Sequence, residues 1–105
     1  MTTPLHITTG RAVDGVARLS AVGEIDLTNA AEFAAQLRDA LGDGSARLLV
    51  DLTRVEYLDS AALATLFAHA ERLDIRISPL NEALLTFSGL DQLAAVEVVA
   101  EDVGA

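Results

Sequence analysis

A short apolar run in the middle of the chain, residues 46–52, constrains the fold more than any other feature. It consists of Ala, Leu and Val, with Arg47 and Asp51 as its charged residues. The run is shorter than a typical helix, and its Val and Leu content is typical of a buried strand. Near-continuous apolar character is typical of strands inside a parallel sheet. We therefore expect a central strand covered on both faces, which favours an α/β architecture.

The residues before this run predict a β-hairpin and then a helix. Apolar and polar residues alternate over 5–9 and over 16–21, and Asp14-Gly15 between them is typical of a hairpin turn. The buried face of the helix is predicted from apolar residues at helical spacing, namely Leu27, Ala30, Phe33, Ala34, Leu37 and Leu41. We expect this helix to end at the glycines of 42–44.

The residues after the run predict a connection and a second helix. Apolar and charged side chains are interspersed between Asp51 and Asp59, which suits a short ordered connection. Helical spacing begins at Ser60 and continues through positions 63, 66, 67, 70 and 73. Either Asp59 or Ser60 supplies the oxygen that caps the free N–H groups of this helix.

The last third of the chain predicts one more helix between two strands. Ile75 and Ile77 mark a strand that Pro79 closes, and Asn81 is expected to cap a short helix through Ser88. The apolar run 94–99 predicts an edge strand. The order is therefore β-β-α-β-α-β-α-β, which predicts one α/β domain over 1–105, with a mixed sheet and helices packed on it.

The acidic composition limits the kinds of partner. Seven Lys and Arg residues stand against 16 Asp and Glu, which gives a net charge of −9 with both histidines neutral. Such a charge repels phosphates, so direct nucleic-acid binding is not expected. The acidic field favours a basic protein surface as partner. No apolar stretch approaches the roughly 20 residues of a membrane-spanning helix, so no membrane insertion is expected.

The absence of cysteine bears on compartment and on metals. With no Cys, neither disulfides nor thiolate zinc sites can hold the fold, and a cytoplasmic location is expected. Residues 1–10 carry no basic segment followed by an apolar run, which argues against a secretory signal. Glu24 and Asp26 offer the carboxylates that Mg²⁺ prefers. A helix cap and a solvated acid explain them better, so no metal is expected.

Ser60 is a candidate nucleophile, but the sequence offers it no base. His69 lies nine residues further along the same predicted helix, about 13.5 Å along its axis and on its opposite face. His6 could approach only through the tertiary fold. The chain has no Gly-x-Ser-x-Gly elbow, no lysine for a P-loop and no glycine-rich dinucleotide fingerprint. We therefore expect neither catalysis nor a cofactor.

Two roles for Ser60 are compatible with a helix start. If Ser60 is only an N-cap, its replacement by Ala costs about 1 kcal/mol of stability. If it is a functional site, a phosphoryl group fits there, because the helix dipole favours an anion at this end. Such a group adds about −1.5 to −2 charge at pH 7 beside Asp59, on a face that is already acidic. The added charge would switch off a protein–protein contact.

Three segments resemble a known family. Residues 50–63 (VDLTRVEYLDSAAL) are similar to the signature of STAS domains, the anti-sigma factor antagonists. Residues 23–27 (GEIDL) resemble the family's turn before its first helix, and residues 84–91 (LLTFSGLD) resemble its Gly-Leu-Asp segment. With the element order, the resemblance covers nearly the whole chain.

The resemblance implies a partner-switching function. An unphosphorylated antagonist of this family binds an anti-sigma factor kinase of the histidine-kinase-like ATPase type and thereby releases a sigma factor for transcription. The kinase phosphorylates the serine that follows the family's Asp, which here is Ser60, and a PP2C-type phosphatase restores it. We expect Ser60 as phosphoacceptor, Asp59 as the acid that shapes its recognition, and Asp26 as the next contact. Glu24, Ala61 and Ala62 are expected to border this contact face.

Two positions depart from the family pattern. The family commonly has Gly where this chain has Ala62, so a methyl group is added at the helix start. Residues 101–105 are too short for the closing helix that many members carry.

Two alternatives from other classes stay open. STAS domains also serve as small subunits of ABC transport complexes, such as those that move lipids, where the same helix face docks on an ATPase. In that role the hydroxyl of Ser60 is an interface contact and needs no phosphate. STAS folds can also present a ligand pocket beside the same loop, although nothing in this sequence names a ligand.

Overall fold

In the computed structural model, which describes residues 4–11 and 14–100, a five-stranded sheet forms the framework. Its strands lie in chain order across the sheet: β1 His6–Arg11, β2 Ala17–Ile25, β3 Leu48–Leu58, β4 Leu73–Ile77 and β5 Ala95–Val98. The strands β1 and β2 form an antiparallel hairpin, whereas every other pair of neighbours is parallel. The predicted mixed sheet is therefore confirmed, with β3 at its centre.

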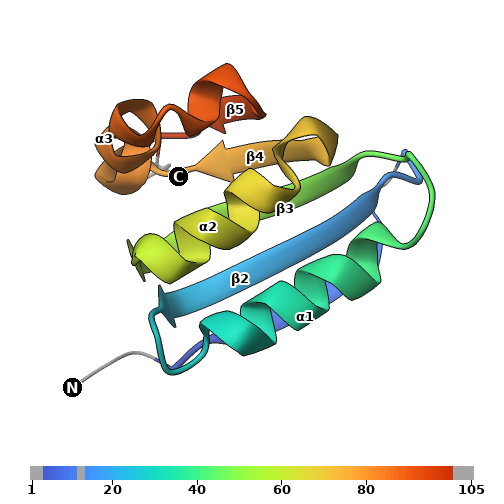
Figure 1. Cartoon of the computed structure of the whole chain (residues 1–105), viewed down its shortest axis with the longest axis horizontal. Coiled ribbons are helices and arrows are strands. Elements are labelled where there is room, and N and C mark those ends of the chain that lie inside the picture. The colour runs from blue at the N-terminus through green and yellow to red at the C-terminus, as the bar shows by residue number, and fades with distance from the viewer. Residues whose placement is uncertain (1–3, 12–13, 101–105) are drawn as a thin grey trace.

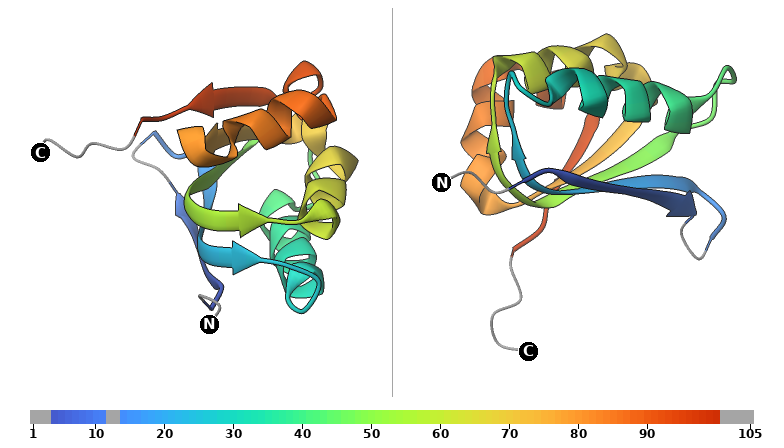
Figure 2. Two further views of the ribbon diagram at one scale, coloured as in Figure 1. Left: turned by 90° about the vertical axis from the view of Figure 1, so that its left-hand side faces the viewer. Right: turned by 90° about the horizontal axis from the view of Figure 1, so that it is seen from below.

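Helices cross over between the parallel strands. They are α1 Ala30–Leu41, α2 Ser60–Ala68 and α3 Pro79–Ser88, with single 3₁₀ turns η1 Ala70–Arg72 and η2 Leu90–Gln92. Figure 1 shows α1 and α2 running along β2 and β3, while α3 lies beside β4 and β5. In Figure 2 the sheet curls around these helices, which cover its concave face. The predicted element order β-β-α-β-α-β-α-β is confirmed.

The core lies between the helices and one face of the sheet. Along β3 the buried residues are Leu48, Val50, Leu52, Val55 and Leu58. Leu49 and Asp51, which alternate with these residues, are only half-buried, because they point to the opposite face, which no helix of the described residues covers. The prediction of a strand covered on both faces is therefore wrong. The apolar Leu49, which lies on the uncovered face, made the run look continuous.

The structure also corrects the connection predicted between Asp51 and Asp59. These residues continue β3 as far as Leu58. Their charged side chains, Arg54 and Glu56, are exposed on either side of the buried Val55. The mixture of charged and apolar residues is thus that of a strand with one wet face. The buried Leu52, Val55 and Leu58 lie three residues apart, because the pairing of β3 with β2 is irregular here.

Asn81 is not a helix cap. Helix α3 begins at Pro79 with Ser78 in the N-cap position. Asn81 is buried within the helix, and its Nδ2 donates a 2.8 Å hydrogen bond to the backbone oxygen of Val55. Its polar side chain therefore fastens α3 to β3 from inside the fold.

Leu27 is not part of the buried face of α1. The helix begins three residues later, at Ala30, and the side chain of Leu27 is 80% exposed. The remaining predicted positions are buried or half-buried on the inner face of α1. The closing segment 101–105, where the sequence departs from the family pattern, lies outside the described residues.

Candidate functional site

The carboxyl ends of β2 and β3 bring two loops together at one edge of the sheet. Ile25 and Leu58 are register partners at the ends of these parallel strands. The backbone N–H of Asp59 donates a 3.1 Å hydrogen bond to the oxygen of Ile25. The turn that follows β2 and the start of α2 therefore lie side by side, as Figure 2 shows from this end of the molecule.

Asp59 is the cap of helix α2. Its Oδ1 accepts hydrogen bonds from the N–H of Ala61 at 2.9 Å and of Ala62 at 3.1 Å. Its backbone is extended, and its carbonyl oxygen accepts the first helical bond, from Leu63, at 3.1 Å. These are the features of an N-cap residue. The choice left open by the sequence is settled in favour of Asp59.

Ser60 is the first residue inside α2, and its side chain is exposed. Within the described part of the chain, its hydroxyl makes no hydrogen bond. His69 is the C-cap residue that follows α2, so it lies at the end of the helix opposite Ser60, as the spacing predicts. His6 belongs to β1, and β2 lies between that strand and β3. Ser60 is thus open to another protein but has no adjacent histidine.

Asp26 lies in a turn whose hydrogen bonds hold it in one arrangement. Its Oδ1 accepts hydrogen bonds from the N–H of Thr28 at 2.9 Å and from its hydroxyl at 2.5 Å. The bonds from Thr28, above all the one from its hydroxyl, lower the pKa of Asp26 below its ordinary value. The carboxylate is therefore ionised at neutral pH and adds negative charge beside α2.

Asn29 completes this turn. Its Oδ1 accepts a 2.9 Å bond from the N–H of Asp26, and its Nδ2 donates a 2.9 Å bond to the oxygen of Glu24. Asn29 is the N-cap residue of α1, but its side chain does not cap the helix because it is engaged in the turn. The turn is fixed at both ends, and it directs Leu27 outward.

The structure brings some of the predicted contact residues together and separates others. Asp26, Asp59 and Ser60 lie at the same edge, with the half-buried Ala61 next to them. Ala62 has no exposed surface and belongs to the hydrophobic core, so its methyl group faces the sheet. Glu24 precedes the core residue Ile25, so its side chain lies on the opposite face of the sheet.

Leu27 is a surface residue that the sequence pattern does not reveal. Its spacing fits the apolar face of α1, and the pattern therefore predicts a buried residue. The nearby pair Asp26 and Asn29 was the available signal, since both residue types favour turns before a helix. A turn at this point would have placed Leu27 outside the helix.

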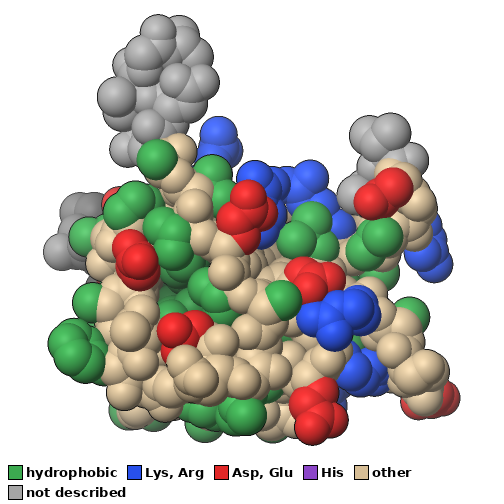
Figure 3. Space-filling view, turned by 90° about the horizontal axis from the view of Figure 1, so that it is seen from above, with side chains coloured by type: hydrophobic (Ala, Val, Ile, Leu, Met, Phe, Trp, Pro, Cys, Tyr) green, Lys and Arg blue, Asp and Glu red, His purple; other side chains and the backbone are tan. Residues whose placement is uncertain are grey.

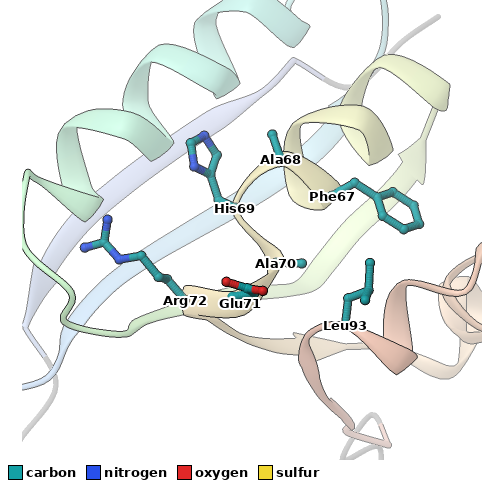
Figure 4. A pocket seen from close by; sticks show the side chains of 7 residues that line it. All are labelled: Phe67, Ala68, His69, Ala70, Glu71, Arg72 and Leu93. Atoms are coloured by element: carbon teal, nitrogen blue, oxygen red, sulfur yellow. The ribbon is translucent and has the colours of Figure 1, made fainter.

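Two surface hollows bear on the ligand alternative. One, of about 330 Å³, is lined by residues 67–72 and Leu93, at the end of α2 opposite Ser60. In Figure 4 Phe67 and Leu93 point toward one another across it, while the His69 and Arg72 side chains extend to the other side. A wider one, of about 960 Å³, lies among Val22, Gly23, residues 53–56 and 78–80, Val99 and Ala100. Neither hollow includes Ser60, Asp59 or Asp26.

The described residues offer neither a metal-ligand cluster nor a membrane-spanning helix. No group of three or more His, Asp or Glu side chains suited to a metal ion occurs within residues 4–11 and 14–100. Over the same residues, no helix has the length and apolar character needed to cross a membrane.

The chain is similar to proteins of one known family. The model described as "Mlab, STAS domain" matches residues 9–99. The anti-sigma-F factor antagonist RsfB of Mycobacterium tuberculosis is 40% identical over 60 residues, which is 57% of this chain and 49% of RsfB. The matched segment therefore spans about half the length of this curated relative.

Solved structures agree with this fold. A crystal structure of an anti-sigma factor antagonist from Mycobacterium paratuberculosis matches with a TM-score of 0.75 and 27% identity, over 89% of this chain and 85% of that one. The anti-sigma factor antagonist SpoIIAA in its unphosphorylated form matches with a TM-score of 0.67, over 92% of this chain and 90% of that one. The identity to SpoIIAA is 18%, so that likeness concerns the fold alone.

Proposed function

The chain belongs to the STAS domain family, and from this premise we propose that it is a cytoplasmic anti-sigma factor antagonist that phosphorylation at Ser60 switches off. The unphosphorylated form binds an anti-sigma factor kinase of the histidine-kinase-like ATPase type, and this binding frees a sigma factor for transcription. A PP2C-type phosphatase returns the phosphorylated form to the binding state. The names of RsfB and of the mycobacterial structure support this role.

The observation that carries the proposal is that Asp59 caps α2 while Ser60 does not take part in the cap. Asp59 satisfies the first N–H groups of α2, while the exposed Ser60 hydroxyl makes no hydrogen bond within the described residues. A phosphoryl group on Ser60 therefore leaves the helix cap in place. The modification changes the surface and not the fold, as a reversible switch requires.

The switch acts through local electrostatics. A phosphoserine adds about −1.5 to −2 charge at pH 7 and carries a tightly held shell of water. The Asp26 and Asp59 carboxylates at the same edge repel it. A partner that covers Ser60 has to remove this water as well, and removing water from a charge costs several kcal/mol unless the charge is paired. Both effects weaken binding of the phosphorylated form.

A phosphorylation assay tests the phosphoacceptor. The wild-type protein, Ser60→Ala and Ser45→Ala are incubated with ATP and the purified anti-sigma factor kinases of the source organism. Ser45 is a matched control because it is an exposed serine before β3, at the opposite end of that strand. We expect one added phosphate on the wild type and on Ser45→Ala, and none on Ser60→Ala. Equal phosphorylation of Ser60→Ala would refute the proposal.

A binding assay separates this function from the transport alternative. Wild-type protein and Ser60→Glu are used as baits, and bound proteins are identified by mass spectrometry. We expect an anti-sigma factor kinase on the wild type and its loss on Ser60→Glu. Recovery of an ABC ATPase with no sigma regulator would instead favour the transport subunit. Treatment of the phosphorylated form with a PP2C-type phosphatase should restore kinase binding.

A further inference from the structure

We propose that Leu27 is the apolar anchor of the partner contact beside Ser60, and that it inserts into an apolar pocket on the kinase whose rim is basic. This inference rests on the proposed function and names the chemistry of the partner surface. It concerns a residue outside the motif that identifies the phosphoacceptor.

Leu27 is an apolar residue whose side chain is open to solvent. The Leu27 side chain is 80% exposed, whereas Phe33 and Leu37 of the following helix are fully buried. A single exposed leucine is ordinary on a protein surface and proves nothing alone. The surroundings of Leu27 decide its meaning.

The turn that carries Leu27 is held by several hydrogen bonds. The Asp26 carbonyl oxygen accepts hydrogen bonds from the N–H of Asn29 at 3.2 Å and of Ala30 at 2.9 Å. The side chains of Asp26 and Asn29 add hydrogen bonds within the same turn. These bonds fix the backbone on both sides of Leu27. A side chain presented on a preorganised turn loses less conformational entropy on binding than one on a mobile loop. The turn thus holds Leu27 ready for a partner.

Leu27 lies on the loop next to the start of α2. The Asp59 N–H bond to the Ile25 oxygen fastens the start of α2 to the end of β2, and Leu27 follows Ile25 by two residues. Any partner that covers the Ser60 hydroxyl therefore meets this turn. Burial of an apolar side chain beside Ser60 also explains why a phosphate there opposes binding, since the same contact excludes water.

Acidic residues accompany Leu27 and Ser60 on their loops. Asp26 and Asp59 flank Leu27 and Ser60, whereas Arg38, Arg47 and Arg72 lie at the other end of the strands, where α1 ends and where β3 and β4 begin. Figure 3 views the molecule from the side of α3 and β5 and shows basic side chains at the centre and right-hand part of this face, with acidic side chains on both halves. Beside Leu27 and Ser60 themselves, the neighbouring charged side chains on the two loops are the acids Asp26 and Asp59. Basic groups around the partner's pocket would complement these acids.

A titration tests the anchor. Each purified anti-sigma factor kinase is titrated with wild type, Leu27→Ala and Leu93→Ala by calorimetry. Leu93 is the matched control because it is 56% exposed and lies at the opposite end of the molecule, before β5. Full burial of a leucine side chain stabilises a complex strongly. We therefore expect the Kd of Leu27→Ala for the kinase to be at least about tenfold higher than that of the wild type. Leu93→Ala should bind within about twofold of the wild type.

Companion measurements make each outcome decisive. Thermal unfolding of Leu27→Ala should match that of the wild type, because the side chain is exposed, and Leu27→Met should keep most of the affinity. If Leu27→Ala binds as tightly as the wild type, the anchor is refuted while the proposed function stands. If the wild type binds no anti-sigma factor kinase, the proposed function fails, and the anchor with it.

Discussion

Asp59 and Ser60 are neighbours in the sequence with separate physical tasks. Asp59 accepts the N–H bonds at the start of α2, and Ser60 presents an exposed hydroxyl. In a serine that capped the helix, phosphorylation would replace the hydroxyl oxygen by charged phosphate oxygens as the acceptor of the cap bond, which would couple the modification to helix stability. Because the cap belongs to the aspartate, the surface charge can change while α2 stays formed.

This division predicts different stabilities for two substitutions. Asp59→Ala removes an N-cap side chain and should lower the free energy of unfolding by about 1 kcal/mol, within a range of about 0.5 to 2. Ser60→Ala exchanges an exposed residue inside the helix for the best helix former and should change it by less than about 0.5 kcal/mol. Urea unfolding of both variants measures the difference. Equal losses would contradict the assignment of the cap.

Asp51 predicts a pH dependence at the same scale. Burial alone would raise the pKa of Asp51, but hydrogen bonds from Thr53 and a 2.9 Å ion pair with Arg18 outweigh burial and lower it from its ordinary value of 3.8. A carboxyl group with a lowered pKa in the folded state stabilises the fold above its unfolded pKa. This contribution is lost as the pH falls below 3.8 through the folded pKa.

Urea unfolding between about pH 7 and about pH 3 checks this sign. The Asp51→Asn variant should be less stable than the wild type at neutral pH, and the difference should shrink in acid. Asp43→Asn, in the exposed turn after α1, is the control and should show little difference at any pH. A constant gap between wild type and Asp51→Asn would contradict the prediction.

At the scale of the elements, the sequence predicted what local periodicity determines. The hairpin, the start of α2 at Ser60, the strand before Pro79 and the element order follow from spacing and turn residues, and the structure confirms them. Periodicity could not show which face of β3 is covered, because Leu49 is apolar on the wet side. Periodicity also placed Leu27 on α1. Leu27 lies three residues before Ala30, and this separation fits helical spacing even though residues 27–29 form a turn.

Asn81 shows why long-range polar bonds escape a sequence. Its residue type favours helix caps, and its actual partner, the Val55 carbonyl, lies 26 residues earlier in the chain. Only the packing of α3 on β3 brings the two together. The edge that carries Asp26 and Ser60 has the same origin, because the two residues follow strands β2 and β3, which pair in parallel.

The buried bond of Asn81 predicts a stability loss at the scale of elements. Asn81→Ala leaves the Val55 carbonyl without its 2.8 Å partner and should cost about 1 to 3 kcal/mol. Gln92, an exposed amide in η2, is the control, and Gln92→Ala should change stability by less than about 0.5 kcal/mol. Urea unfolding compares the two variants. If Asn81→Ala leaves the free energy of unfolding unchanged, the bond does not hold α3 in place.

At the scale of the whole molecule, two of the arginines that join elements, Arg47 and Arg72, lie where the parallel strands begin, although the net charge is −9. Arg47 pairs with Asp74 there, and Arg72 donates to the oxygen of Leu41 at the end of α1. A third, Arg76, pairs with Glu97 near the other end of β4. At the other end of β2 and β3, Asp26 and Asp59 flank the exposed serine. The acidic field should therefore orient a basic partner toward the end with Ser60.

This polarity predicts that two substitutions of equal net charge differ in effect. Asp26→Asn and Glu71→Gln each remove one negative charge, but Asp26 lies beside Ser60 and Glu71 lies beyond the far end of α2. An asparagine oxygen can still accept the Thr28 bonds, so the turn should persist. Association with the kinase should slow for Asp26→Asn, and its salt dependence should become shallower, because charges near the contact steer encounter most. Stopped-flow rates across a salt series measure both variants, and identical salt slopes for the two would show that the partner docks without regard to this edge.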